Sequence, residues 1–184
     1  MANRASHSST VAVIGLGCVG LVSLKNLLDE GFQVTGYERN SYIGGIWKYN
    51  NGPHLSALES TVLNISRERI GKQSCFTDFP FPDDADPFPT AEQTQKYLED
   101  YAAHFWLWDH IQLNTEVNGI RRDENLNKWE IQLTKSDGQK TTEHYDKLVM
   151  ATGINQIPSW PKIPGIDGFQ GDVIHSISYK GYMP

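Results

Sequence analysis

The sequence predicts an α/β protein, in which a Rossmann-like domain with a parallel sheet carries an inserted antiparallel β-meander. The first observation behind this prediction is a strand, a glycine turn, a helix, a second strand and an acid, which follow one another between Val11 and Glu38. That order is typical of a βαβ unit. The second observation is a series of short segments between Ile111 and Tyr145 in which apolar and polar residues alternate, as in antiparallel strands with one buried face.

The βαβ unit begins with the β-branched run from Val11 to Ile14. A G-x-G-x-x-G turn follows, and a helical pattern then runs as far as Gly31, before a second strand from Phe32 to Tyr37. The turn glycines are Gly15, Gly17 and Gly20. In a dinucleotide-binding unit the first permits the tight turn, the second lets the backbone approach a pyrophosphate, and the third lets helix and strand pack closely.

Glu38 ends the second strand and is the acid expected at this point of the unit. Its carboxylate can accept hydrogen bonds from a ribose diol and disfavours a 2′-phosphate, so the site suits FAD or NAD rather than NADP. The alternative interpretation, a tight turn that merely uses glycines, is less favoured because the whole unit is present. Cys18, inside the turn, is interpreted as a small residue rather than a redox group.

The composition argues against several classes of function. The net charge is −6, the pI is about 5.4 and no basic run exceeds Arg121–Arg122, which argues against a nucleic-acid partner. No apolar run approaches the roughly 20 residues that span a bilayer, so no membrane partner is expected. Two cysteines, Cys18 and Cys75, are too few for a disulfide framework, and a cytoplasmic location is expected. The histidines show no H-x(3)-H spacing, and no metal site is predicted.

Three regions are expected along the chain. Residues 1–10 are predicted to be a disordered leader, residues 11–153 the dinucleotide-binding domain with the β-meander at about 111–145, and residues 154–184 a proline-rich linker. Residues 40–90 show no clear periodicity, and this stretch is interpreted as a functional cover.

A helix is predicted after the irregular region. Thr90 and Gln93 have the spacing of a capping box, in which each side chain accepts a hydrogen bond from the other residue's backbone N–H. Four aromatic residues are expected on one helical face and are interpreted as core rather than as a cofactor contact: Tyr97, Tyr101, Phe105 and Trp108.

A glycine pair, Gly44–Gly45, lies shortly after Glu38. Such a pair lets a second stretch of backbone lie against a ligand that extends past its first ribose and pyrophosphate, as FAD does. A simple turn is the alternative. The meander, and the predicted strand from Leu148 to Ala151 that leads into Thr152–Gly153, favour FAD.

The sequence resembles the flavin-containing monooxygenases, a branch of the flavoproteins with two dinucleotide-binding domains. The matching strings are GLGCVG at 15–20, Glu38, GGIW at 44–47, Asn64 within NISRE, DFPFPDD at 78–84, ATG at 151–153 and FQGDVIHSISY at 169–179. The last string is similar to the family fingerprint F-x-G-x(3)-H-x(3)-Y/F and places the fingerprint in the linker segment. The resemblance implies that residues 11–153 form a FAD-binding domain.

The resemblance also implies roles for individual residues. The pyrophosphate of FAD would lie against the turn glycines, the adenosine ribose on Glu38, and the flavin near Trp47. Asn64 matches an asparagine whose side-chain amide lies near the flavin and protects the oxygen adduct; without the resemblance it is a candidate turn residue. The expected cofactor-binding residues are Gly15, Gly17, Gly20, Glu38, Arg39, Gly45, Trp47, Thr152 and Gly153, and the expected catalytic residue is Asn64.

Members of that family draw electrons from NADPH, which sits on a second glycine-rich unit, and transfer oxygen to a soft nucleophile or a ketone. The glycines after Gly153 lack G-x-G-x-x-G spacing, and no arginine follows Arg122, so an NADPH site is expected to be absent from this chain. The family's final strand and helix of the FAD domain are also not matched. An open sheet edge would result, which predicts a homo-oligomer or a partner chain.

The expected function is that of a FAD-dependent oxidoreductase of the flavin-containing monooxygenase type, which acts on a small molecule and needs a partner or an external reductant. The alternatives are a non-oxygenating isomerase or cyclase on the same FAD pocket, and a non-catalytic FAD-binding module. His175 belongs to the fingerprint and is interpreted as a structural residue, with acid–base catalysis as the alternative. The sequence does not identify the substrate.

Overall fold

The computed structural model describes residues 9–48, 75–82, 89–153 and 158–175. The chain divides into two units, one formed by residues 1–45 and 95–153 and the other by residues 46–94 and 154–184. Most of the predicted leader lies outside the described residues, and its disorder stays a prediction. Among the residues described, no helix has the length and apolar character needed to cross a bilayer.

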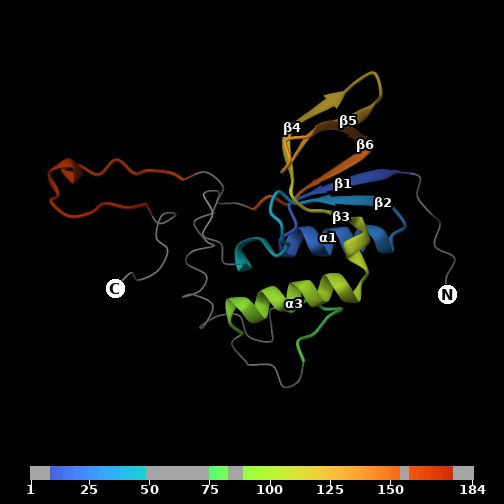
Figure 1. The fold of residues 1–184 in the computed structure, drawn as a ribbon, viewed down its shortest axis with the longest axis horizontal. Helices are drawn as coiled ribbons and strands as arrows, with labels where there is room; N and C mark the ends of the chain where they lie inside the picture. Colours follow the sequence, from blue (N-terminus) through green and yellow to red (C-terminus); the bar gives the residue numbers. More distant parts are fainter. Residues whose placement is uncertain (1–8, 49–74, 83–88, 154–157, 176–184) are drawn as a thin grey trace. The chain divides into compact units, whose positions relative to one another are not determined.

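The first unit contains a four-stranded parallel sheet. Its strands are β1 (Thr10–Ile14), β2 (Gln33–Tyr37), β3 (Ile111–Gln112) and β7 (Lys147–Met150), in the order β3-β2-β1-β7. Helix α1 (Cys18–Asp29) connects β1 to β2 and lies along one side of these strands (Figure 1). The arrangement confirms the predicted Rossmann-like parallel sheet.

Side chains of β1 and β2 alternate between the two faces of the parallel sheet. Val13 and Gly36 are partners in the register of the two strands and face α1. A Cβ on Gly36 would lie 2.8 Å from Leu16 Cδ2, so only glycine leaves room for the side chains under the helix. Ala12 and Tyr37 face the opposite side, where they belong to a different buried cluster.

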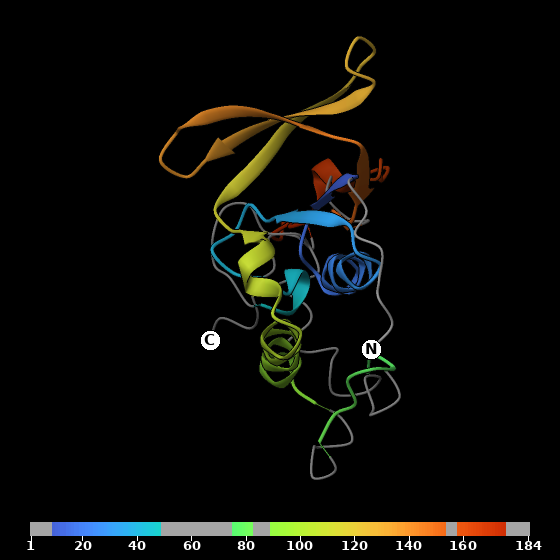
Figure 2. The same ribbon diagram turned by 90° about the vertical axis from the view of Figure 1, so that its right-hand side faces the viewer.

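The predicted meander forms a separate antiparallel sheet. Its strands are β4 (Thr115–Asp123), β5 (Lys128–Lys135) and β6 (Lys140–Tyr145), in that order. This sheet lies on the side of the parallel sheet opposite α1 (Figures 1 and 2). Ile131, Leu133 and Tyr145 are buried together with Ala12 and Tyr37, so the two sheets share one core.

The meander starts at Thr115, later than the start at about residue 111 that the sequence predicts. Ile111 and Gln112 instead pair with β2 in the parallel sheet. Between the two sheets the chain turns at Asn114, whose φ of 52° lies in the left-handed region that asparagine tolerates better than most residues. A strand of two residues has no readable periodicity, so the sequence could not separate it from the meander.

Helix α3 (Ala91–His104) begins at the predicted capping box. The N–H of Thr90 donates to Gln93 Oε1 at 2.7 Å, and the N–H of Gln93 donates to Thr90 Oγ1 at 3.2 Å. Two of the N–H groups at the helix start are therefore satisfied by side chains, which confirms the capping box.

The prediction that Trp108 shares a helical face with Tyr97 and Tyr101 is wrong. Tyr97 and Tyr101 are buried, but the helix ends at His104 because Trp106 adopts a left-handed φ of 58°. Trp108 then falls in a short 3-10 helix, with 41% of its surface exposed. The aromatic spacing continued past the helix end, where helical periodicity no longer applies.

In the second unit, His175 of the fingerprint segment contacts residues 159–160. Its Nε2 lies 3.2 Å from Ser159 O, and its ring centroid lies 4.9 Å from that of Trp160. These contacts are those of a residue that holds a loop in place, and they support the structural interpretation of His175.

Candidate functional site

The carboxyl ends of β1 and β7 meet where the strand order of the parallel sheet reverses. The N–H of Ala151 donates to Ile14 O at 2.8 Å, and Gly15 leaves β1 with a φ of 89°. A Cβ on Gly15 would lie 2.6 Å from Ala151 O, so only glycine fits here. In open α/β sheets, ligands bind in the crevice outside such a reversal point.

Helix α1 begins beside this reversal point and uses no side chain as a cap. Its N-cap is Gly17, and the first helical hydrogen bond runs from the N–H of Leu21 to Gly17 O at 3.0 Å. The N–H groups of residues 18–20 therefore lie outside the helical ladder, and no acidic residue stands in the first turn. The positive end of the helix dipole favours a phosphate at this point.

At Gly20 the absence of a side chain makes room for neighbouring protein atoms. A Cβ on Gly20 would overlap Gly15 O and would lie 3.5 Å from Ala151 Cβ. Glycine at this position therefore lets α1 pack closely against the ends of β1 and β7.

The backbones of Gly17 and Gly45 face each other beside the start of α1. A Cβ on Gly45 would lie 3.2 Å from Gly17 Cα, and a Cβ on Gly17 would lie 3.8 Å from Gly45 Cα. The N–H of Gly44 donates to Leu16 O at 2.8 Å, which fixes the glycine pair against the turn. Two segments of bare backbone thus lie together where the helix presents its N–H groups.

Gln95 of α3 holds the same glycine pair. Its Nε2 donates to Ile43 O at 2.8 Å and to Glu99 Oε1 at 2.9 Å, and only 4% of its surface is exposed. Its Oε1 accepts no hydrogen bond from any residue that the structure describes, and a Cβ on Gly44 would overlap this oxygen. Gln95 is not among the residues predicted from the sequence; the available signal was a polar residue within the buried face of the helix.

Glu38 lies at the end of β2 with 6% of its surface exposed. Its Oε2 accepts from the N–H of Leu16 and its Oε1 from the N–H of Asn40, each at 3.0 Å. The N–H of Glu38 in turn donates to Gln112 O of β3 at 3.0 Å. These bonds fix the carboxylate beside the glycine turn, with lone pairs remaining for ribose hydroxyls.

The other predicted site residues differ in where the structure places them. Arg39 is exposed directly after Glu38, and Thr152 and Gly153 are exposed directly after β7. Trp47 ends the 3-10 helix η1 (Gly45–Trp47) and belongs to the second unit. Asn64 lies outside the described residues, and its catalytic role stays a prediction.

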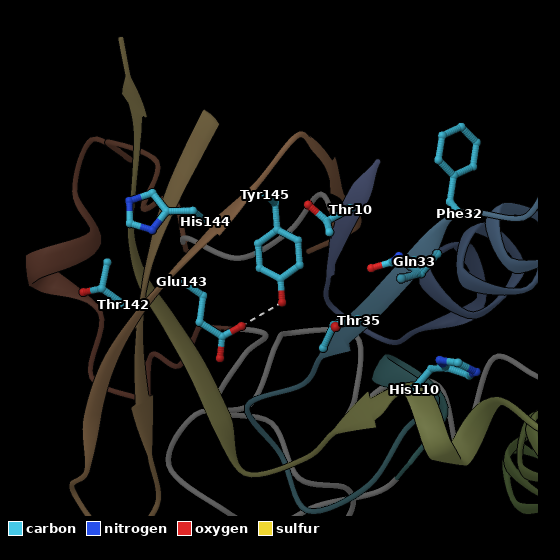
Figure 3. Close-up of a pocket in the computed structure, with 10 residues that line it drawn as sticks. Thr10, Phe32, Gln33, Thr35, His110, Thr142, Glu143, His144 and Tyr145 are labelled. Carbon is cyan, nitrogen blue, oxygen red and sulfur yellow. Dashed lines mark hydrogen bonds between the residues drawn. The ribbon is translucent and has the colours of Figure 1, made fainter. Parts of the chain in front are cut away.

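A cavity of about 620 Å³ lies near the amino ends of β1 and β2 (Figure 3). Its lining does not include the glycine turn, which follows the carboxyl end of β1. Its lining includes Thr10, Gln33, His110, Glu143 and Tyr145. The hydroxyls of Tyr145 and Tyr37 donate to Glu143 Oε2 at 2.8 and 2.6 Å. Burial, followed by the hydrogen bonds of this cluster, raises the pKa of Tyr37, and burial likewise raises the pKa of Tyr145.

The strand order, the glycine turn and the acid after β2 define a dinucleotide-binding α/β protein. The residues present fit FAD, because the start of α1 offers N–H groups to a pyrophosphate and the adjoining backbones of Gly17 and Gly45 carry no side chains that would block its approach. Residues 8–183 match the family described as flavin-binding monooxygenase-like. The chain belongs to this family, whose cofactor is a flavin.

Individual relatives and a solved structure agree with this assignment. Monooxygenase aurF of Gibberella zeae is 48% identical over 172 residues, which cover 93% of this chain and 32% of that protein. Flavin-containing monooxygenase FMO GS-OX-like 1 of Arabidopsis thaliana is 35% identical over 198 residues, 97% of this chain and 41% of that protein. The structure of S-allyl-L-cysteine S-oxygenase from Allium sativum aligns with a TM-score of 0.80 at 30% identity, covering 93% of this chain and 42% of that one. The chain spans less than half the length of each of these proteins.

Proposed function

We propose that the chain binds FAD at the glycine turn and forms the FAD-binding part of a flavin-dependent monooxygenase that acts on a small molecule. The observation that carries this proposal is the approach of Gly17 to Gly45 beside the N-terminus of α1. Backbone from two separate segments meets there without side chains, which suits a pyrophosphate and the cofactor that continues from it. Membership of the flavin-binding family supports the same cofactor.

Different residues of the chain would bind different parts of FAD. The N–H groups of residues 18–20 would donate to the pyrophosphate, and Glu38 would accept from the adenosine ribose. Gln95 would keep the Gly44–Gly45 backbone in place beside the glycine turn. Bound FAD supplies the redox chemistry, namely the reaction of the reduced flavin with oxygen. Trp47 and Asn64 are proposed flavin neighbours on the strength of the family resemblance.

The source of electrons is the second part of the proposal. We infer that NADPH, or another reductant, acts through residues outside this chain, on a partner chain or on a second polypeptide segment. The support is the lack of a second G-x-G-x-x-G after Gly153 and the greater length of the relatives. We also propose that the chain associates with a partner. A cytoplasmic location is proposed as well, because NADPH is available there.

Titration of the purified chain with FAD, followed by flavin fluorescence, tests the first part. One FAD is expected to bind per chain, and Gly17→Ala is expected to weaken binding about tenfold or more because its methyl group would occupy the phosphate position. Gly168→Ala is the matched control, since its added Cβ meets no atom within 4 Å. Equal FAD affinity of the unmodified chain and Gly17→Ala would contradict the proposed site.

Reduction of the bound flavin tests the second part. NADPH alone is expected to leave the flavin oxidised, whereas dithionite, which needs no binding site, is expected to reduce it. Rapid reduction by NADPH alone would overturn the inference about the electron source while leaving the FAD site intact. Turnover of a thioether or amine after dithionite reduction is expected to need oxygen; turnover without oxygen would point to an isomerase or cyclase.

A further inference from the structure

Three side chains of metal-ligand type converge on the meander, outside the proposed FAD site. Asp123 at the end of β4, Glu130 in β5 and His144 in β6 each offer one ligand atom, and these atoms lie within 4.8 Å of one another. We propose that this cluster binds a divalent transition-metal ion such as Zn²⁺.

The register of the meander places all three side chains on one face. Glu130 is the partner of Arg121 in β4 and of His144 in β6, and Asp123 stands two residues after Arg121. Figure 3 shows His144 on the side of β6 opposite to Tyr145. Tyr145 belongs to the shared core, so the cluster faces away from that core.

Asp123 is oriented by the turn that follows β4. Its Oδ1 accepts hydrogen bonds from the N–H groups of Asn125 and Leu126 at 2.9 and 3.1 Å. Its Oδ2 faces His144, with 3.8 Å between Oδ2 and Nε2. One carboxylate oxygen is thus held by the backbone while the other is directed at the imidazole.

Glu130 is oriented by Arg121. Its side chain is only 7% exposed, and its two oxygens accept from Arg121 Nε at 2.7 Å and from Arg121 Nη2 at 2.5 Å. Oε1 also accepts from Gln132 Nε2 at 3.5 Å, whereas Oε2 retains a second lone pair and lies 3.7 Å from His144 Nε2. Carboxylates that bind a metal ion usually accept hydrogen bonds from neighbouring groups in this way. The guanidinium also offsets the charge of Glu130, which allows this buried carboxylate to persist without an ion.

The distances fit a bound ion better than direct hydrogen bonds. Both separations from His144 Nε2 exceed hydrogen-bond range. Ligand atoms around a tetrahedral Zn²⁺, with bonds of about 2.0–2.1 Å, lie roughly 3.3–3.5 Å apart, so small side-chain rotations would complete the site. One imidazole nitrogen and two carboxylate oxygens suit Zn²⁺, Co²⁺ or Mn²⁺, whereas Ca²⁺ prefers oxygen ligands alone.

A bound ion would link the three strands of the meander near the turn that joins β4 to β5. Because the ion would bind the folded chain and not the unfolded one, it would stabilise the meander, and the free energy of unfolding would rise with the logarithm of the ion concentration above the Kd. A chain pattern such as H-x(3)-H cannot reveal this site, because each ligand comes from a different strand and only the register brings them together.

Titration of the untagged, FAD-loaded chain with Zn²⁺, in competition with a chromophoric chelator, tests the proposal. One Zn²⁺ is expected per chain, with affinity reduced about tenfold or more in His144→Gln and in Asp123→Asn. The matched controls are His110→Gln and Asp137→Asn, which change the same residue types outside the cluster and are expected to bind as the unmodified chain does. Equal affinity in all five proteins would overturn the proposal and leave only an ion-pair cluster.

Two further measurements on the unmodified chain keep the test independent of how the variants fold. Binding of Co²⁺ is expected to give a spectrum without a thiolate charge-transfer band; such a band would place the ion at Cys18 or Cys75 instead. Nitrogen-15 spectra of the imidazoles are expected to show one side chain, that of His144, shifting at one equivalent of Zn²⁺. No imidazole shift would also overturn the proposal.

Discussion

Gly17 and Gly45 approach each other so closely that a Cβ on Gly45 would lie 3.2 Å from Gly17 Cα. The reverse change is milder, since Gly17 has a φ of −74° and its Cβ would lie at an ordinary 3.8 Å from Gly45 Cα. We therefore expect Gly17→Ala to change the free energy of unfolding by less than about 1 kcal/mol while FAD affinity falls about tenfold or more. Urea unfolding without FAD and FAD titration measure the two effects. A large loss of stability would mean that Gly17 serves packing instead.

Gly20→Ala is expected to show the opposite pattern. The new Cβ would overlap Gly15 O, so α1 would have to move away from the strand ends. Overpacking of this kind costs about 1–3 kcal/mol. Urea unfolding of the FAD-free chain checks this, with Gly168→Ala as the control. An unchanged unfolding midpoint would contradict the close packing of α1 against Gly15.

The glycine turn and Glu38 were accessible from the sequence because their information is local. Strand, turn, helix and acid follow one another without interruption, and the backbone requirement at Gly15 selects glycine at a fixed position. The capping box at Thr90 is local in the same sense. These elements could be placed without knowledge of the tertiary structure.

Gln95 and the cluster around His144 depend on contacts between distant parts of the chain. The hydrogen bond from Gln95 to Ile43 joins residues 52 positions apart. The pairing of Glu130 with His144 exists only in one register, and a slip of one residue would move the two side chains to opposite faces. Such features follow from packing and register, which periodicity alone does not specify.

Glu38→Gln is expected to lower both stability and FAD affinity. The carboxylate accepts from two backbone N–H groups, those of Leu16 and Asn40, and an amide replaces one acceptor by a donor. Loss of a charge-assisted bond in this buried position costs about 1–3 kcal/mol. Urea unfolding and FAD titration measure the two losses, and Glu116→Gln, an exposed change on β4, is the control. Unchanged FAD affinity would remove Glu38 from the proposed ribose site.

Gln95→Leu separates the positioning of the glycine pair from the stability of the core. The change deprives Ile43 O of its donor but also removes an Oε1 that accepts no bond from the described residues. These contributions have opposite sign and similar size, about 1–3 kcal/mol each, so unfolding should change little. FAD affinity should fall, because the Gly44–Gly45 backbone loses its anchor. FAD titration and urea unfolding check this, with the exposed Gln170→Leu as control; a loss of stability with unchanged affinity would assign Gln95 to the core alone.

Tyr37 and Tyr145 join the parallel sheet to the meander through hydroxyl oxygens 2.6 Å apart, and both hydroxyls also lie within 2.8 Å of Glu143 Oε2. An ionised carboxylate only accepts, so three oxygen–oxygen contacts share two phenolic protons, and each hydroxyl depends on the other. We expect Tyr37→Phe and Tyr145→Phe each to lower the free energy of unfolding by about 1–2 kcal/mol. The double variant should lose less than the sum, with a coupling energy of about 0.5–3 kcal/mol in urea unfolding. Strict additivity would show that the two hydroxyls act independently and that the network does not connect the sheets.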